Sequence, residues 1–121
     1  PTQIAEARAM TEIVCVQNLY NLAHRQDDVM VADLAEAGIA YVPYFPLGGF
    51  TPLQSDALSK VSVELGATPM QVALTWLLQR SPNLLLIPGT SSVAHLTENL
   101  KAADVGLPEA AVARLDQIGA S

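Results

Sequence analysis

The chain has 121 residues, of which 50% are hydrophobic and only 15% are charged. That length suits one domain and is too short for two, and the composition excludes a disordered chain, which needs low hydrophobicity and high charge. Twelve acidic residues against six basic ones give a net charge of −6. Because nucleic acid and anionic membrane surfaces both attract a basic face, neither is expected as a partner.

Targeting signals and cysteine content indicate the cellular compartment and the kinds of site to expect. No apolar run approaches the roughly 18 residues of a membrane span, and the first residues lack the basic start and apolar core of a signal peptide. The single cysteine, Cys15, cannot form an internal disulfide or a cysteine-based metal site. We therefore expect a cytoplasmic protein with no metal site, whose partner is a small molecule or another protein.

The first third of the chain predicts a strand and a helix, with a short helix over residues 2–11 before them. The β-branched run at 13–16 is typical of a strand buried on both faces, and Cys15 within it is interpreted as a small buried hydrophobe. Asp27 and Asp28 are expected to cap the following helix and to place negative charge at its start. The helix ends at Gly38, and three of its residues are expected on one face: Val29, Leu34 and Ala37.

The middle of the chain predicts a second strand and two helices. The strand covers 39–44 and runs into a rigid, irregular loop of prolines and glycines: Pro43, Pro46, Gly48 and Gly49. A helix over residues 52–65 stops at Gly66. The next helix has Thr68 as N-cap and Pro69 as its first residue, and residues 70–80 are apolar almost all round. Its inward face is expected to include Trp76, Leu77 and Leu78.

The last third predicts a strand and two helices. The strand covers 84–87 and ends at Pro88 and Gly89, and Ser91 or Ser92 then caps a helix with one apolar face: Val93, Leu96 and Leu100. A final helix starts at Pro108 and carries Val112, Leu115 and Ile118 on one stripe, with Glu109 and Asp116 expected on its solvated face. Strands that alternate with helices favour an α/β fold with a parallel sheet, and no linker divides residues 1–121.

In parallel α/β folds ligands bind beyond the carboxyl ends of the strands, so these ends carry the functional signal. Amides and an aromatic occupy 17–21, an aromatic precedes a glycine loop at 44–49, and a hydroxyl-rich helix start follows 88–89. Such groups suit a flat heterocycle that carries phosphates. Taken singly, each segment is better explained by a turn, a rim residue or a helix cap, and neither G-x-G-x-x-G nor a P-loop is present.

Together these strand ends resemble the aldo-keto reductases. The resemblance rests on residues 16–21, 38–49 and 87–92, with His95-Leu96 and Glu98-Asn99, which match the family in order and spacing over nearly the whole chain. It implies that residues 1–121 are the C-terminal portion of a (β/α)8 barrel, with about three parallel strands and their flanking helices. A small open doubly wound sheet with another ligand is the alternative, and it requires a different order of strands.

The resemblance also implies a nicotinamide cofactor and assigns residues to it. Gln17 would hydrogen-bond the nicotinamide carboxamide, and Tyr44 would stack on the nicotinamide ring. The pyrophosphate would be lined by Phe45, Leu47 and Gly48. The adenosine end would be held by residues of the last strand end and the helix after it: Thr90, Ser91, His95, Glu98 and Asn99.

Two positions depart from the family's usual pattern. Gly89 and His95 stand where the family often has Lys and Arg for the 2′-phosphate of NADP. Charge-assisted contacts to that phosphate are therefore reduced, although Gly89 lets the backbone approach it. NADP is the expected cofactor, with NAD as the alternative.

The catalytic residues of the family have no counterpart in the chain. The catalytic Asp, Tyr, Lys and His of the family lie in its N-terminal half, and no segment here matches those motifs. No other catalytic residue is assigned, and His24 is interpreted as a solvated loop histidine. The chain is thus expected to be the C-terminal portion of an NAD(P)(H)-dependent aldo-keto reductase that reduces aldehydes or ketones when complete, and to be inactive alone. The alternative is a non-catalytic, truncated barrel fragment that self-associates or pairs with another chain through its open edges.

Overall fold

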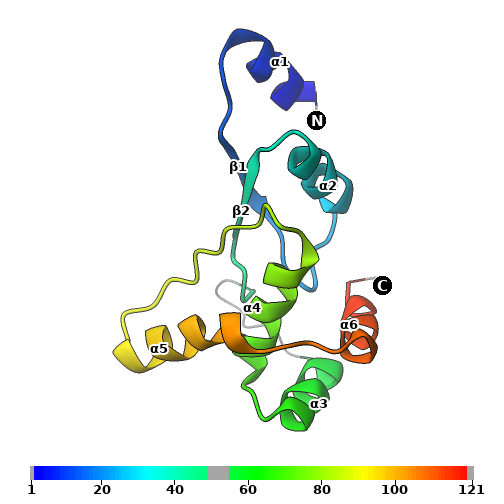
Figure 1. The fold of residues 1–121 in the computed structure, drawn as a ribbon, viewed down its shortest axis with the longest axis vertical. Coiled ribbons are helices and arrows are strands. Elements are labelled where there is room, and N and C mark those ends of the chain that lie inside the picture. The colour runs from blue at the N-terminus through cyan, green and yellow to red at the C-terminus, as the bar shows by residue number, and fades with distance from the viewer. Residues whose placement is uncertain (1, 49–54, 120–121) are drawn as a thin grey trace.

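The computed structural model describes residues 2–48 and 55–119. Its elements in chain order are α1 (Thr2–Met10), β1 (Cys15–Leu19), α2 (Asp28–Glu36), β2 (Ala40–Tyr44), α3 (Asp56–Leu65), α4 (Pro69–Arg80), α5 (Val93–Lys101), the short 3-10 helix η1 (Ala102–Asp104) and α6 (Glu109–Asp116) (Figure 1). The helix predicted over residues 52–65 is observed from Asp56, and its expected start at Pro52, like Gly49, lies outside the described residues. No helix in the described ranges is long and apolar enough to cross a membrane.

The sheet is parallel, as predicted, and its strands follow the order of the chain. β1 pairs with β2 in a register that places Gln17 opposite Val42 and Leu19 opposite Tyr44. The third predicted strand is reduced to a single parallel bridge between Leu84 and Tyr41 within the described residues, because the chain then leaves the sheet toward α5. Sequential order is that of neighbouring barrel strands, so the alternative of a doubly wound sheet is not supported.

Helix ends in the middle of the chain form as the sequence predicts. Gly66 closes α3 in the left-handed region, with φ of 63°, where glycine avoids the steric cost of a side chain. Thr68 caps α4 reciprocally with Gln71, and Pro69 is its first residue. Ser92, of the two serines considered, caps α5 by accepting a hydrogen bond from the backbone N–H of His95.

The predicted face of α2 is confirmed at Leu34 and wrong at Val29 and Ala37. Val31 and Leu34 are the buried residues of this helix, whereas Val29 and Ala37 face solvent. Residues three positions apart lie on the same side of a helix, so Val31 and Leu34 point together toward the core while Val29 points away from it. The helix ends before Gly38, as predicted.

The core is centred on the rings of Tyr20, Tyr41 and Trp76. Tyr20 lies edge-on to Tyr41 at 5.8 Å and stacks on Trp76 at 6.2 Å between ring centroids. Trp76 and Leu77 are buried as predicted, but Leu78 is 39% exposed because it lies on the outer side of α4. α3 and α6 add apolar side chains to the same cluster: Leu58, Val61, Ala111 and Leu115.

Asn83 connects three parts of the core, just before residues 84–87, the predicted third strand, meet the sheet. Its side-chain amide donates to the carbonyl of Val31 at 3.3 Å and to that of Ile39 at 3.0 Å. The backbone carbonyl of Asn83 accepts a hydrogen bond from the backbone N–H of Tyr41 at 2.9 Å. One residue thus joins the middle of α2, the start of β2 and the chain that follows α4.

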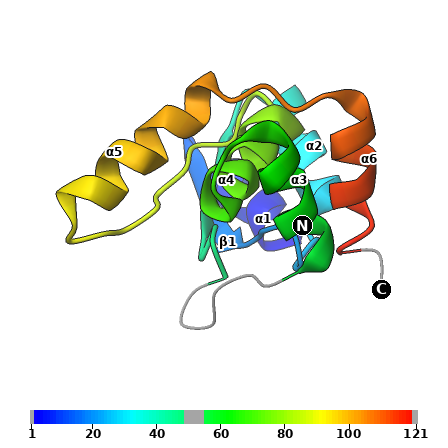
Figure 2. The same cartoon turned by 90° about the horizontal axis from the view of Figure 1, so that it is seen from below.

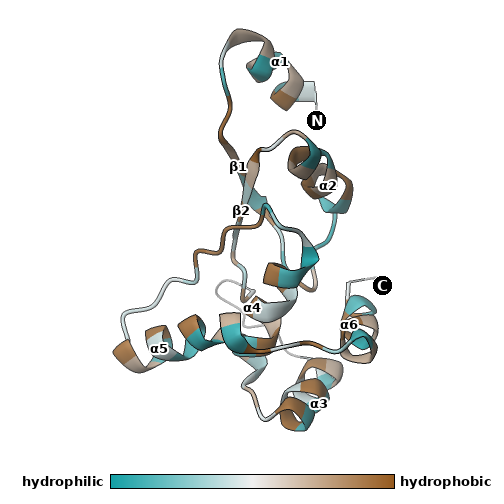
Figure 3. Ribbon diagram, in the orientation of Figure 1, coloured by the Kyte–Doolittle hydropathy of each residue, from teal (hydrophilic) through white to brown (hydrophobic). Residues whose placement is uncertain are grey.

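Two apolar surfaces are uncovered, which corrects the expectation that the first strand is buried on both faces. Val14 is 70% exposed and Cys15 is also exposed, because β1 has one neighbouring strand among the residues that the structure describes. On α5, Val93 is 80% exposed and Leu100 is 68% exposed, and this helix projects from the rest of the molecule (Figure 2). The half of the extended segment toward α5 that lies next to the sheet is also apolar (Figure 3).

Candidate functional site

The carboxyl ends of β1 and β2 bring the predicted nicotinamide residues close together. Leu19 and Tyr44 are the paired last residues of the two strands, so Gln17 and Asn18 lie beside the end of β2. The Tyr44 hydroxyl donates a hydrogen bond to Oδ1 of Asn18 at 3.3 Å. Gln17 is exposed and Tyr44 is 38% exposed, so both side chains are accessible to a ligand.

A surface pocket of about 400 Å³ lies at these strand ends. It is lined by four of the residues expected to contact a cofactor, namely Tyr44, Phe45, Leu47 and Gly89, together with Pro46, Ile87 and Pro88. Phe45 stands edge-on to Tyr44, with 5.5 Å between ring centroids and 89° between planes. The end of β2 and residues 87–89, at the end of the predicted third strand, therefore form one concave, mostly apolar surface of the size that small-molecule ligands occupy.

The loop after β2 has an unusual backbone that Asn21 holds in place. Phe45 has φ of 53° and Gly48 has φ of 92°, and the Gly48 N–H donates to the Phe45 carbonyl at 3.0 Å. The fully buried side chain of Asn21 also donates to that carbonyl, at 3.0 Å, and its Oδ1 accepts from the backbone N–H groups of Ala23 and His24. Asn21 was noted in the sequence as one of several strand-end amides, yet here it supports the loop.

The residues expected at the adenosine end lie at the start of α5 and along it. Thr90, Ser91 and His95 are exposed, and Oγ1 of Thr90 accepts from the backbone N–H of Ser92 at 3.1 Å. Asn99 is partly buried. This group lies outside the pocket, and Gly89 is the residue that connects the two along the chain.

Glu98 makes contacts that the sequence did not indicate. Its Oε1 accepts from the Thr68 hydroxyl at 2.7 Å, and its carbonyl accepts from the Gln71 side chain at 3.0 Å. Both partners belong to the capping box of α4, so Glu98 fastens α5 to the start of that helix. Its second carboxylate oxygen, Oε2, has no such contact with Thr68.

The side chain of Asp27 bonds to residues of β1 and β2 and does not cap α2, which corrects its expected role as a side-chain cap. Its Oδ2 accepts from the Asn18 amide and from the Tyr41 hydroxyl, each at 2.7 Å. Burial, and then the bond to Asp27, raise the pKa of Tyr41, which is opposite to what a proton donor in catalysis requires.

Asp28 forms the second half of this polar cluster. It accepts hydrogen bonds from the Tyr20 hydroxyl and from Arg25, and Nη2 of Arg80 lies 3.0 Å from its Oδ2. Burial opposes ionisation of Asp28, but the bonds from Tyr20 and Arg25 and the nearby guanidinium charges outweigh it and lower its pKa. Burial and the bond to Asp28 raise the pKa of Tyr20, so this tyrosine is no better suited to donate a proton than Tyr41.

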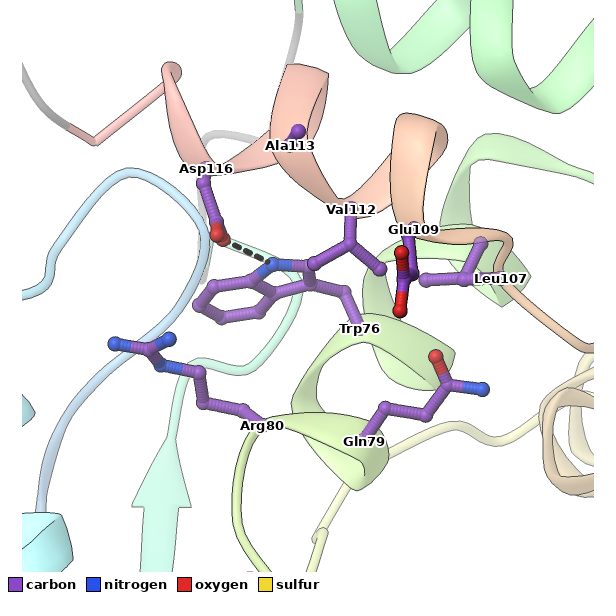
Figure 4. A pocket seen from close by; sticks show the side chains of 8 residues that line it. All are labelled: Trp76, Gln79, Arg80, Leu107, Glu109, Val112, Ala113 and Asp116. Carbon is purple, nitrogen blue, oxygen red and sulfur yellow. Dashed lines mark hydrogen bonds between the residues drawn. The ribbon is translucent and has the colours of Figure 1, made fainter.

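A second pocket, of about 410 Å³, lies between α4 and α6 and contains none of the predicted cofactor residues (Figure 4). On its wall the indole N–H of Trp76 donates to Asp116 at 2.9 Å, which corrects the expectation that Asp116 is only a solvated residue of α6. Glu109 is exposed, as predicted, and so is His24. Within residues 2–48 and 55–119, no cluster of His, Cys, Asp or Glu side chains is arranged to hold a metal ion.

Comparison with known sequences identifies relatives over the whole chain. The model of the aldo/keto reductase family matches residues 1–120. The chain is 70% identical over 118 residues to pyridoxine 4-dehydrogenase of Escherichia coli K12, an alignment that covers 98% of this chain and 41% of that protein. It is 43% identical over 119 residues to an uncharacterized oxidoreductase of Schizosaccharomyces pombe, covering 98% of this chain and 39% of that protein.

Solved structures agree with this assignment. A thermostable aldo-keto reductase in complex with the inhibitor epalrestat superposes with a TM-score of 0.84 at 32% identity, over 97% of this chain and 44% of that one. An aldo-keto reductase of the silkworm Bombyx mori in complex with NADPH gives a TM-score of 0.80 at 25% identity, over 98% of this chain and 39% of that one. The chain thus spans about two fifths of the length of its relatives.

Proposed function

Because this chain belongs to the aldo/keto reductase family, we propose that it is the cofactor-carrying, C-terminal part of an NAD(P)(H)-dependent oxidoreductase barrel. The observation that carries the proposal is the pocket at the strand ends, which joins Tyr44, Phe45, Leu47 and Gly89. Gln17 lies on the neighbouring strand β1, opposite Val42, where it would meet the nicotinamide carboxamide. The exposed residues at the start of α5 would meet the adenosine end.

The substrate we propose follows from the identity of 70% to pyridoxine 4-dehydrogenase. The complete protein would oxidise the alcohol group of pyridoxine to an aldehyde while NAD(P)+ takes up the hydride, and it would reduce the aldehyde in the reverse direction. The groups that transfer the proton would come from the part of the barrel outside this chain, because both buried tyrosines here have raised pKa values. We therefore propose that the chain alone is inactive, and that the complete enzyme works in the cytoplasm.

The choice between the two cofactors depends on the adenosine end. Gly89 has no side chain to contact a 2′-phosphate, and space beside it is open. His95 is exposed at the start of α5, where a phosphate would also meet the helix N-terminus. We propose NADP as the cofactor because a 2′-phosphate would meet this helix N-terminus, and NAD is the alternative because the contacts from Gly89 and His95 are weaker than those of Lys and Arg.

Titration and turnover of the complete protein test this function. We expect NADPH or NADH to bind, pyridoxine to be oxidised with the matching cofactor, and the isolated chain to show no turnover. Tyr44→Ala should weaken cofactor binding about tenfold or more, because stacking on a base contributes roughly 1–3 kcal/mol. Val63→Ala, which truncates an exposed apolar side chain on α3, is the matched control and should leave binding unchanged. Absence of binding by the unmodified protein would refute the proposal.

Self-association of the isolated chain is a second candidate behaviour, favoured by the uncovered face of α5. Val93, Leu96 and Leu100 lie along one side of that helix, and all three are exposed. We expect the isolated chain to form dimers or larger species at micromolar concentration, because apolar surface of this kind associates in water.

Sedimentation equilibrium measures this association directly. Leu100→Glu should weaken it, whereas Val63→Glu, at a still more exposed position on α3, should not. A well-folded monomer at all concentrations would contradict the expectation, and would leave the cofactor proposal standing.

A further inference from the structure

We propose that Asn18 and Asp27 are positioning residues that hold the Tyr44 ring ready for the nicotinamide, an inference that rests on the cofactor site proposed above. The three side chains form one line of hydrogen bonds from the end of β2 to the start of α2. The Tyr44 hydroxyl donates to Oδ1 of Asn18 at 3.3 Å. Nδ2 of Asn18 donates to Oδ2 of Asp27 at 2.7 Å.

Asp27 sets the direction of this line. A carboxylate only accepts hydrogen bonds, so the Asn18 amide turns its NH₂ group toward Asp27 and its oxygen toward Tyr44. The Tyr44 hydroxyl must then donate its proton to Asn18. This bond therefore holds the hydroxyl end of the Tyr44 ring. The hydroxyl can then only accept a hydrogen bond from a ligand, because its proton is already donated to Asn18.

The remaining contacts of the Tyr44 ring complete its placement. Phe45 stands at 89° to it, with 5.5 Å between centroids, so the edge and the hydroxyl of the ring system are both constrained. The ring nevertheless lines the pocket and is 38% exposed. An aromatic ring that is held in place before a ligand arrives loses little rotational freedom when the ligand stacks on it.

Asp27 is itself held firmly. Its Oδ2 also accepts from the hydroxyl of Tyr41, whose ring is fully buried in the core. The line of hydrogen bonds therefore starts from a rigid part of the fold and ends at the accessible ring. Tyr41 therefore supports the line of hydrogen bonds at Asp27.

Affinities of the complete protein for whole cofactors and for cofactors without nicotinamide test the inference. Asn18→Ala should weaken binding of NADPH and NADH about threefold to tenfold, the range expected for one hydrogen bond. Affinities for ADP-ribose and for its 2′-phosphate should stay unchanged, because these probes lack the ring that Tyr44 would meet. Tyr44→Phe should have the same effect, and the double variant should be no worse than the more affected single one.

Two further variants separate positioning from stability. Trp76→Phe removes the indole hydrogen bond to Asp116, which lies outside this line, so it should lower stability and leave the ratio of NADPH to ADP-ribose affinity unchanged. The exchange Asn18→Asp with Asp27→Asn keeps one carboxylate and one amide in contact, and the new carboxylate at position 18 can still accept from Tyr44. This exchange should restore most of the NADPH affinity that Asn18→Ala loses.

The results have distinct meanings. Equal weakening for NADPH and ADP-ribose, or no weakening in Asn18→Ala and Tyr44→Phe, would overturn the positioning role while the cofactor site stands. If Asn18→Ala does not fold, Tyr44→Phe, which retains the ring, decides the question. No binding of NADPH or NADH by the unmodified protein would refute the proposed function and this inference with it.

Discussion

Replacing Trp76 with alanine is expected to lower the free energy of unfolding by about 3 to 5 kcal/mol, the range for deleting a large buried aromatic side chain. Trp76 is 1% exposed, stacks on Tyr20 and donates its indole N–H to Asp116. The guanidinium groups of Arg25 and Arg80 also lie over its ring, at 5.2 and 5.8 Å from the centroid. The alanine variant loses all of these contacts and leaves a cavity between α4 and α6 (Figure 4). Urea denaturation measures the change.

Two controls locate the effect in this side chain. Trp76→Phe retains an aromatic ring beside Tyr20 and loses the hydrogen bond to Asp116, so it should cost about 1 to 2 kcal/mol. Val63→Ala, on the outer side of α3, should change stability by less than about 0.5 kcal/mol. A Trp76→Ala variant as stable as Val63→Ala would show that the core is not centred on this ring.

Asp28→Asn is expected to destabilise the fold by about 2 to 3 kcal/mol at neutral pH, because Tyr20, Arg25 and Arg80 then lose a charged acceptor. The effect should depend on pH. The folded state lowers the pKa of Asp28, so the ionised carboxylate stabilises the fold above its ordinary pKa of about 4. That contribution is lost as the pH falls through the lower, folded value. The gap between the unmodified protein and the variant should therefore be constant near neutral pH and shrink in acid.

Denaturation at several pH values between about 7 and 3 checks this prediction. Asp33→Asn is the matched control, because Asp33 is an exposed carboxylate on the same helix, α2. It should leave both the stability and its pH dependence nearly unchanged. A gap that stays constant into acid would show that the carboxylate of Asp28 is not favoured by the fold.

Local signals in the sequence were sufficient where the cause of a structure is itself local. Gly66 ends α3 because its φ of 63° suits glycine, and Thr68 and Pro69 begin α4 because their own geometry fits a helix start. The pairing of β1 with β2 also followed from the pattern, since a strand, a helix and a strand in succession favour a parallel pair. The identification of the family rested on these strand ends taken together.

The pattern failed where burial or bonding depends on distant residues. A run of β-branched residues indicates a strand that expects cover on both faces, yet Val14 and Cys15 are exposed because only β2 lies beside their strand. The side chains of Asp27 and Asp116 lie near helix ends but bond to Tyr41 and Trp76, partners that no local signal can name. Of the candidate site, the residues that line the pocket at the strand ends could be predicted, whereas the side chains that support them, such as Asn21, were visible only as unassigned amides.

The bond from Thr68 to Glu98 makes the start of α4 and the candidate adenosine end thermodynamically linked. Oε1 of Glu98 accepts from the Thr68 hydroxyl, and because a carboxylate offers about four acceptor positions, the others are left for a ribose hydroxyl. A ligand that displaced the Thr68 hydroxyl would bind more weakly by the free energy of that bond. Linkage is reciprocal, so a ligand that binds Glu98 only in its docked position would strengthen the contact of α5 with α4 by the same factor by which that contact strengthens its own binding.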